Sequence, residues 1–191
     1  MMILRDALPR DSDALGELHV HSWIESYTGL IDPQILSGLS VPDRSASWRR
    51  MIETPQPRSR ILLLEREGAL LGFGAAGAQR NRSLASQGYD GEIAAIYLLK
   101  AAQGTGDGRR LFTALAQSLA EQGFRAHALW VLTENRPARG FYERLGGRLL
   151  SLSRPLPHLG GPEEVAYGWR DLRPLPANPD NPNCTNRKGT G

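Results

Sequence analysis

Three glycines at alternate positions, Gly104, Gly106 and Gly108, constrain the fold of this 191-residue chain more than any other feature. They follow a segment rich in Ile, Leu and Tyr at residues 92–99, which is typical of a β-strand, and they precede residues 111–119, whose apolar positions recur with helical period. Glycine lets the backbone pass close to a ligand and point several N–H groups at one position. The N-terminus of the following helix adds about half a positive charge. The sequence therefore predicts an anion-binding loop between a strand and a helix.

Two arginines at the start of this helix, Arg109 and Arg110, fit a bound anion. Cations in a first helical turn oppose the helix dipole, and a bound phosphate turns that repulsion into attraction. A nucleoside-triphosphate loop requires Gly-Lys-Ser/Thr where this chain has Gly108-Arg109-Arg110. A dinucleotide fingerprint requires glycine at position 109, yet Glu134 follows the next predicted strand, where a ribose-binding acid belongs. A dinucleotide-binding oxidoreductase therefore stays open as an alternative.

Hydrophobic periodicity along the chain predicts an α/β or α+β domain, with helices on the faces of one sheet and one crossover unit at residues 92–132. In the helix that is expected to start at Asp43, we predict that Trp48, Met51 and Ile52 form the buried face. The predicted strands are residues 3–5, 61–65, 69–75, 92–99, 128–132, 149–153 and 165–171, and the predicted helices are residues 12–26, 33–36, 43–54, 106–123 and 137–145.

Residues 173–191 differ in composition from the rest of the chain, because they hold four of the 13 prolines and no aromatic residue. Such a segment buries too little apolar area to offset its ordering entropy, so we expect a disordered or loosely draped tail and one domain at residues 1–172. Three basic residues and one acidic residue of the tail supply +2 of the formal net charge of +3. The charge of the domain therefore gives no support to a nucleic-acid partner.

Membrane insertion and metal binding are not expected. The longest stretch without charged or strongly polar residues, 68–78, is shorter than the ~20 residues of a membrane helix, and the first six residues carry charge. The single cysteine, Cys184, cannot form an internal disulfide. His19 and His21 lie two residues apart and hence on different helix faces, and the other two histidines are dispersed. We expect a cytoplasmic protein with no metal and no membrane contact.

The glycine loop belongs to a longer series of motifs. In chain order these motifs are Gln103-x-x-Gly106-x-Gly108, Leu132-Thr133-Glu134-Asn135 and Phe141-Tyr142-x-x-x-Gly146. Together they resemble the GNAT superfamily, the acyl-CoA-dependent N-acyltransferases, over residues 2–172. The resemblance implies a single GNAT-like domain. Its sheet is mixed and mostly antiparallel with about six to seven strands, helices on both faces, and a central splay between two parallel strands.

The resemblance also implies where acetyl-CoA binds. In this superfamily the pantetheine arm lies in the splay as a surrogate strand, and the glycine loop holds the pyrophosphate. Asn135 is expected near the pantetheine or the pyrophosphate; its alternative role is a polar group at the start of the following helix. The implied cofactor-binding residues are Tyr97, Leu98, Leu99, Gln103, Gly104, Thr105, Gly106, Asp107, Gly108, Arg109, Asn135 and Tyr142.

Two residues are implied as catalytic. Tyr142 matches the general acid of the superfamily, and a phenol with a pKa near 10 can protonate the departing CoA thiolate. Its alternative role is that of a core aromatic residue beside Phe141. Glu92 matches a carboxylate that deprotonates the amine, because an alkylammonium loses its proton only near pH 10 and a base or a water chain helps at neutrality. Its alternative role is an ordinary charge at a strand start.

These inferences predict an N-acetyltransferase that moves an acetyl group to a primary amine by direct attack in a ternary complex. No acyl-enzyme is expected, because Cys184 is the only thiol and no Ser-His-Asp arrangement is evident. Trp23 and Tyr27 share a helix face, and they are expected either to line the acceptor pocket or to pack in the core. Residues 156–164 are expected to shape or cover the acceptor site. A catalytically silent CoA-sensing or interaction module is a second alternative. The small-molecule or peptide acceptor is not identified, and a homodimer is left open.

Overall fold

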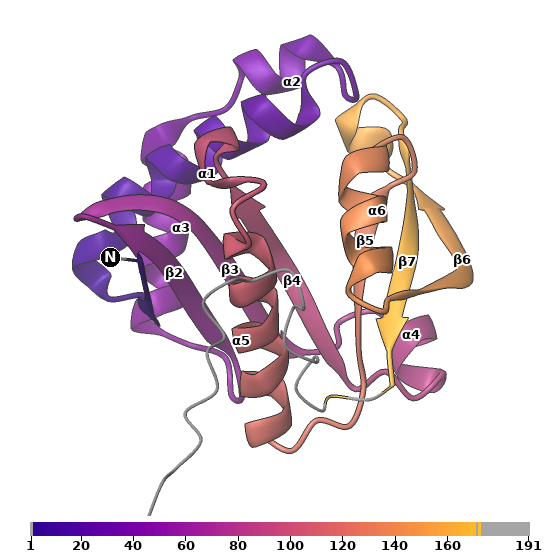
Figure 1. The fold of residues 1–191 in the computed structure, drawn as a ribbon. Helices are drawn as coiled ribbons and strands as arrows, with labels where there is room; N and C mark the ends of the chain where they lie inside the picture. The colour runs from indigo at the N-terminus through magenta and orange to yellow at the C-terminus, as the bar shows by residue number, and fades with distance from the viewer. Residues whose placement is uncertain (1, 171, 173–191) are drawn as a thin grey trace, which may run out of the picture.

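One sheet of seven strands runs through the protein in the order β1-β2-β3-β4-β5-β7-β6 (Figure 1). The computed structural model describes residues 2–170 and residue 172, so the predictions for residues 173–191 lie outside the described part. Neighbouring strands are antiparallel except β4 and β5, which confirms the predicted mixed sheet. The strands are β1 (Met2–Asp6), β2 (Arg60–Arg66), β3 (Ala69–Ala78), β4 (Gly91–Leu98), β5 (His127–Leu132), β6 (Arg148–Pro155) and β7 (Glu163–Trp169).

Helices lie on both faces of the sheet, as predicted (Figure 1). Residues of α1 and α3 pack against one face of β2 and β3, and residues of α5 and α6 pack on the opposite face. Across residues 2–170 no helix has both the length and the apolar character that crossing a membrane requires. The helices are α1 (Ser12–Tyr27), α2 (Pro33–Ser37), α3 (Val41–Glu53), α4 (Arg82–Ser86), α5 (Asp107–Glu121) and α6 (Arg136–Arg144), with 3-10 turns at Pro9–Asp11, Lys100–Ala102 and Pro157–Leu159.

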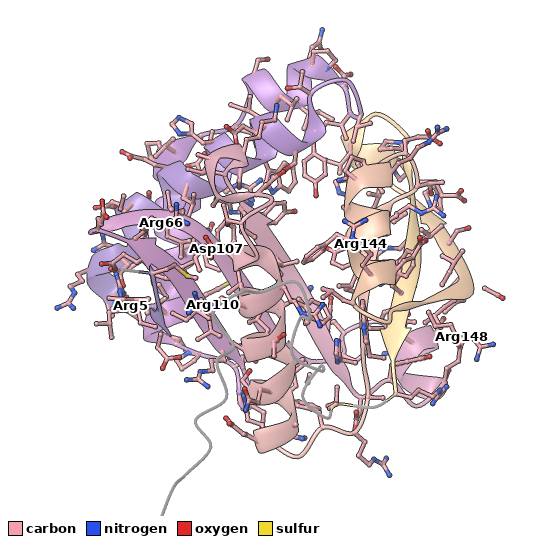
Figure 2. The ribbon with its side chains drawn as sticks, in the orientation of Figure 1. Arg5, Arg66, Asp107, Arg110, Arg144 and Arg148 are labelled. Carbon is pink, nitrogen blue, oxygen red and sulfur yellow. The ribbon has the colours of Figure 1, made fainter. Side chains whose placement is uncertain are left out.

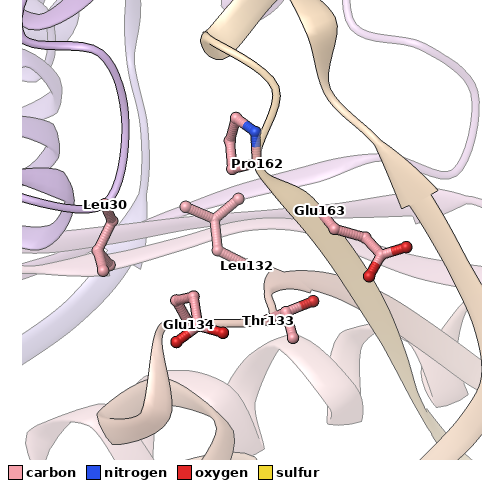
Figure 3. Close-up of a pocket in the computed structure, with 6 residues that line it drawn as sticks. All are labelled: Leu30, Leu132, Thr133, Glu134, Pro162 and Glu163. Carbon is pink, nitrogen blue, oxygen red and sulfur yellow. The ribbon is translucent and has the colours of Figure 1, made fainter.

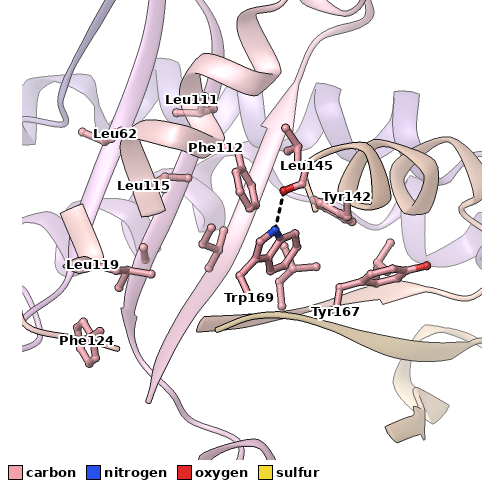
Figure 4. Packing of buried hydrophobic residues seen from close by; sticks show 14 residues of the cluster. Leu62, Leu111, Phe112, Leu115, Leu119, Phe124, Tyr142, Leu145, Tyr167 and Trp169 are labelled. Carbon is pink, nitrogen blue, oxygen red and sulfur yellow. Dashed lines mark hydrogen bonds between the residues drawn. The ribbon is translucent and has the colours of Figure 1, made fainter. Parts of the chain in front are cut away.

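Alternation along β2 divides the hydrophobic core into two layers. Leu62 packs with α5 and Leu63 packs with α1 and α3, because successive side chains of a strand point to opposite faces. The larger layer, shown in Figure 4, joins α5 to α6 and β7 through Phe112, Tyr142 and Trp169. Full burial of a large apolar side chain contributes about 1.5–3 kcal/mol. This layer therefore fixes α6 relative to α5 across the parallel strands.

Two local expectations for α3 were wrong. The helix starts at Val41 and not at Asp43, because the Ser40 hydroxyl accepts a hydrogen bond from the Asp43 N–H and so caps the helix. Met51 is 45% exposed, whereas Ser45 and Trp48 are the buried residues of the helix. The register of α3 is set by Ser45, which packs directly against Gly16 of α1, where a Cβ atom would clash.

The parallel strands β4 and β5 separate soon after they start. They pair only at Gly91 with His127 and at Glu92 with Ala128, so the predicted central splay is confirmed. A bulge at Ala94, between the register pairs formed by Ile93 and Ala95 with β3, adds a bend to β4 where the splay opens. Beyond the two pairs, the facing edges of β4 and β5 carry backbone groups without a strand partner, and an extended ligand with amide groups can pair with them.

Candidate active site

The glycine loop between β4 and α5 has the shape that the sequence predicted. Gly104 (φ 74°) and Gly106 (φ 87°) are both in the left-handed region, where any other residue is strained. The Thr105 hydroxyl donates to the carbonyl of Ala102 at 2.9 Å, and the Gln103 side-chain amide donates to the carbonyl of Leu98 at 3.1 Å. These bonds hold the loop against the end of β4.

The backbone N–H groups of residues 104–108 donate to no acceptor in the described part of the chain. The first N–H groups of a helix lack an intrahelical acceptor, and here the loop before α5 extends that row. Residues 103–106 are exposed, so these donors are open to a ligand. At the same helix start, Gly108 lies 3.4 Å from the ring of Phe141, measured from its ideal Cβ position, so α5 and α6 approach each other here. The arrangement can accommodate an anion at the open end of the splay.

The charged side chains at the start of α5 differ in how far they are buried. Arg110 is exposed in the first turn of α5, and Arg109 is partly buried. Asp107 differs from both, because its carboxylate is buried and lies 2.6 Å from the guanidinium of Arg66. The structure thus places a predicted cofactor-binding residue, Asp107, with its backbone in the loop and its side chain turned away from it.

Tyr142 lies on α6 in the aromatic core, 7% exposed and in ring contact with Phe112, Tyr167 and Trp169 (Figure 4). Its hydroxyl makes no hydrogen bond to any described residue. Burial, and secondarily the neighbouring Tyr97, raise the pKa of Tyr142 well above its usual value. The hydroxyl therefore stays protonated near neutrality, which is the state that a proton donor needs.

Several bonds fix α6, and with it Tyr142. The indole N–H of Trp169 donates to the carbonyl of Leu145 at 2.9 Å (Figure 4), and Arg139 donates to the carbonyl of Thr133 at 3.0 Å. At the helix start, the side-chain oxygen of Asn135 accepts from the backbone N–H of Ala138 at 3.2 Å. Asn135 therefore caps α6, which is its alternative role from the sequence.

Glu92 lies near the point where β4 and β5 are still paired, and its carboxylate is already engaged. It accepts hydrogen bonds from the Arg80 Nε (2.9 Å), Nη2 (2.8 Å) and backbone N–H (3.2 Å), and it is 6% exposed. This contact raises the pKa of the Arg80 guanidinium further. Arg80 was not singled out from the sequence, because the two residues are 12 positions apart and meet only through the pairing of β3 and β4.

An aromatic group lines the α1 side of β4. The hydroxyls of Tyr27 and Tyr97 are 2.8 Å apart, and the ring of Trp23 contacts both tyrosines. The sequence predicted only main-chain contacts from Tyr97, whose side chain instead joins β4 to α1. Next to them, His19 accepts a hydrogen bond from Trp48, and burial lowers the pKa of His19 to about 4. Trp23 and Tyr27 are thus half-buried at the edge of the site, with a partner on β4 itself.

A cavity of about 160 Å³ lies at the end of β5, between the turn after α1 and the start of β7 (Figure 3). The Thr133 hydroxyl is buried there without a hydrogen-bond partner among the described residues. Leu156 and Leu159 pack with Leu30 near the cavity, so residues 156–164 close this side of the molecule. No group of three or more His, Cys, Asp or Glu side chains within residues 2–170 is arranged to hold a metal ion. The lining residues are Leu30, Leu132, Thr133, Glu134, Pro162 and Glu163.

Known proteins are similar to this chain in both sequence and fold. Over 187 residues it is 29% identical to an uncharacterized N-acetyltransferase of Bacillus subtilis, YuaI, covering 92% of this chain and 96% of the relative. It is also 28% identical to a phosphinothricin N-acetyltransferase of Streptomyces viridochromogenes, covering 92% and 90%. Neither relative supports the oxidoreductase or the silent module.

Solved structures with low sequence identity have the same fold. The PaiA N-acetyltransferase of Thermoplasma acidophilum, solved with coenzyme A, has a TM-score of 0.68 at 15% identity and covers 88% of this chain and 99% of its own. YncA of Salmonella typhimurium, solved with acetyl-CoA, has a TM-score of 0.65 at 17% identity and covers 88% and 93%. Residues 21–147 match the acetyltransferase (GNAT) family, which is more than half of the sequence. The chain belongs to the GNAT family of acetyltransferases.

Proposed function

We propose that the protein transfers the acetyl group of acetyl-CoA to a primary amine by direct attack within a ternary complex. The observation that carries this proposal is the row of N–H groups at residues 104–108, which donate to no described residue and lie at the open end of the splay between β4 and β5. Five consecutive donors and a helix N-terminus suit a pyrophosphate. Two proteins of the same fold were solved with coenzyme A or acetyl-CoA, which supports this choice of ligand.

In the proposed complex the chain binds CoA mainly through its backbone. The loop N–H groups take the pyrophosphate, and the free edge of β4 near Leu98 pairs with the pantetheine amides. Leu98 offers its backbone N–H there, since its carbonyl already accepts from Gln103. Tyr97 and Leu99 contribute less, because the Leu99 N–H donates to the carbonyl of Leu71 on β3 and alternation along the strand turns the backbone groups of Tyr97 to the same side. Asn135 is proposed to affect CoA binding only by fixing the start of α6, since its side-chain oxygen caps that helix.

We propose that Tyr142 is the general acid. The amine nitrogen forms a bond to the acetyl carbon, the carbon–sulfur bond breaks, and the sulfur keeps the electron pair and takes a proton from the Tyr142 hydroxyl. One feature supports this role: the hydroxyl has no other partner among the described residues, so its proton can be donated to the sulfur. The new amide nitrogen still loses one proton after the attack, which passes to solvent, and the phenolate recovers a proton from solvent.

Glu92 is the proposed base that takes the proton from the attacking ammonium. The contact with Arg80 sets a condition on this role, because the guanidinium and the backbone N–H of Arg80 fill three of the four acceptor positions of the carboxylate, and only one stays open to the amine unless Arg80 moves aside. Arg80 has a largely exposed side chain, so its departure breaks no buried contact on the arginine side. A water between Glu92 and the amine is compatible with the same proposal.

The acceptor side is proposed to be formed by Trp23, Tyr27 and the cavity at the end of β5. Acetyltransferases of this family act on small-molecule or peptide amines, and the similarity to a phosphinothricin N-acetyltransferase adds amino-acid-like amines to the acceptors worth testing. The cytoplasmic location and the homodimer stay predictions from the sequence.

The test is the release of free thiol from acetyl-CoA with a panel of polyamines, aminoglycosides, amino acids and peptide N-termini, with acetylated product identified by mass. At least one amine should give stoichiometric thiol and N-acetyl product. A shift in melting temperature with acetyl-CoA, compared with NAD and NADP, should be specific to acetyl-CoA, since a ligand of the native state stabilises it. Absence of both the thiol release and the acetyl-CoA shift would refute the proposal.

A further inference from the structure

The glycine loop, which is proposed to bind the pyrophosphate of CoA, contains a negatively charged residue. Asp107 is the first residue of α5 and lies between Gly106 and Gly108, among the N–H donors of the loop. A carboxylate at that position repels a pyrophosphate. It can also turn back and accept hydrogen bonds from the loop N–H groups itself, as aspartate commonly does at helix starts. Either effect would weaken the binding of an anionic ligand.

The structure shows neither effect, because the Asp107 side chain is turned under the loop. Its carboxylate is 5% exposed, it accepts from no backbone N–H in the described residues, and its partner is the Nη2 atom of Arg66 at 2.6 Å. Figure 2 shows Arg66 and Asp107 side by side at the N-terminal end of α5. The pair is a charge-assisted hydrogen bond between residues 41 positions apart.

Arg66 is held in place by the sheet. It is the last residue of β2, opposite both Met2 of β1 and Ala69 of β3, and it precedes the tight turn at Glu67 and Gly68. Strand pairing on both sides fixes the backbone of Arg66, so its guanidinium is presented to α5 from a rigid element. The partner of Asp107 therefore comes from the scaffold and not from the loop.

We propose that Arg66 is a positioning residue for CoA binding: it neutralises Asp107 and holds the carboxylate away from the loop N–H groups. The inference rests on the proposed function, since it assigns a role at the same site. Without Arg66 the carboxylate is left buried and unpaired, a state that proteins avoid by moving the charge toward other donors. Asp107 lies among the loop N–H groups, which have no acceptor in the described residues, so the carboxylate would compete with the ligand for them.

The experiment compares CoA dissociation constants for the wild type, Arg66→Ala, Asp107→Asn and the double variant, by calorimetry at fixed ionic strength. Arg66→Ala should weaken CoA binding about tenfold or more, a loss of roughly 1.4 kcal/mol. Asp107→Asn, which removes the negative charge, should bind CoA at least as tightly as the wild type. The double variant should recover to within about threefold of the wild type, because the competing charge is absent.

Arg60→Ala is the matched control. Arg60 lies on the same strand, its side chain is 39% exposed against 38% for Arg66, and its ion pair with Asp6 is remote from the loop. Its substitution should leave CoA affinity unchanged, and melting temperatures of all variants report folding separately. Turnover at saturating acetyl-CoA should change little in Arg66→Ala while KM rises.

The outcomes separate the two proposals. If the wild type does not bind CoA, the proposed function is refuted and this inference with it. If the wild type binds CoA but Arg66→Ala binds equally well, only the role of Arg66 is wrong. A purely structural role is indicated if Asp107→Asn weakens binding as much as Arg66→Ala and the double variant shows no recovery, which would also overturn the inference.

Discussion

The two ends of β4 differ in how their polar groups are satisfied. At the paired end, Glu92 accepts three hydrogen bonds from Arg80, and the strand pairs with β5. At the splayed end, the N–H groups of residues 104–108 and the Tyr142 hydroxyl have no partner within the described chain. The contrast has two sources: β5 diverges from β4, and the N–H groups of residues 104–108 belong to a loop and the first turn of α5, where no intrahelical acceptor is available.

This contrast separates scaffold from site. Polar groups that are left unpaired in a folded protein cost free energy, and they are retained where a ligand or a reaction uses them. Substitutions at the splayed end that introduce no backbone strain should therefore reduce binding or turnover with little effect on stability. Substitutions at the paired end should mainly lower stability, except at Glu92, which is also the proposed base.

The largest effect is expected for Gly106→Val in the loop. Valine at φ 87° is strained, and its Cβ position has no described atom within 4 Å apart from those of its chain neighbours, so the branched side chain fills space that a ligand would enter. CoA affinity should fall by about a hundredfold or more. The measurement is CoA binding by calorimetry together with the melting temperature.

Gly123→Val provides the control, because Gly123 follows the other end of α5 with a similar φ of 81°. It should cost comparable stability and leave CoA binding intact. Equal CoA affinity in Gly106→Val and the wild type would show that the loop does not contact the cofactor.

Tyr142→Phe tests the second unpaired group of the splayed end. Removal of the hydroxyl leaves the aromatic packing in place, so turnover should fall about tenfold or more while CoA affinity and stability barely change. Steady-state kinetics with calorimetry measures both. Tyr89→Phe is the control, since Tyr89 is another buried tyrosine, packed against Gly168 and away from α6. Unchanged turnover in Tyr142→Phe would remove this residue from the mechanism.

Most of the fold could be predicted from local sequence signals. The loop glycines, the Asp32-Pro33 helix start and the hairpin that turns at Gly68 all depend on residues close in the chain, and each is present in the structure. The start of α3 was two residues off, because serine and aspartate are both good caps and only the Ser40 bond decides between them. The helix α4 was missed, since five residues are too few to show a period.

The contacts of the site residues were less predictable, because they join distant parts of the chain. The residues next to Glu92 in the sequence do not indicate that Arg80 is its partner, and those next to Asp107 do not indicate Arg66. Both pairs depend on strand register, which a single sequence does not specify residue by residue. The sequence therefore identified the residues of the splayed end better than their partners in the scaffold.

Glu92→Gln tests whether a residue at the paired end can take part in the reaction, because Glu92 is both the proposed base and the partner of Arg80. As a base, Glu92 should matter at pH 7 and lose importance near pH 10, where the alkylammonium deprotonates unaided. Turnover should therefore fall about threefold to tenfold at pH 7, less than in Tyr142→Phe, and recover at high pH. The measurement is a pH–rate profile. If only the melting temperature falls and the profile keeps its shape, Glu92 serves the scaffold alone.

The smallest effect concerns His127, a residue at the paired end that departs from this contrast. It lies at the paired end, stacked on Trp169 at 4.9 Å, yet neither ring nitrogen has a partner in the described residues. Burial lowers its pKa to about 3. Below pH 6.5 the unfolded chain binds a proton at this histidine that the folded chain does not bind. The free energy of unfolding should therefore decrease as the pH is lowered from 6.5 to 3, by up to about 1.4 kcal/mol per pH unit.

His127→Phe should reduce that slope between pH 6 and 4.5, measured by urea unfolding, without abolishing it, because His19 has its pKa lowered to about 4 and contributes the same sign. Turnover at pH 7 should stay within about twofold of the wild type, because an apolar ring replaces a neutral one that makes no hydrogen bond. An unpaired polar group at the paired end would then be a packing residue. A large loss of turnover would instead mean that unpaired groups mark function at both ends of β4, and the separation of scaffold from site would fail.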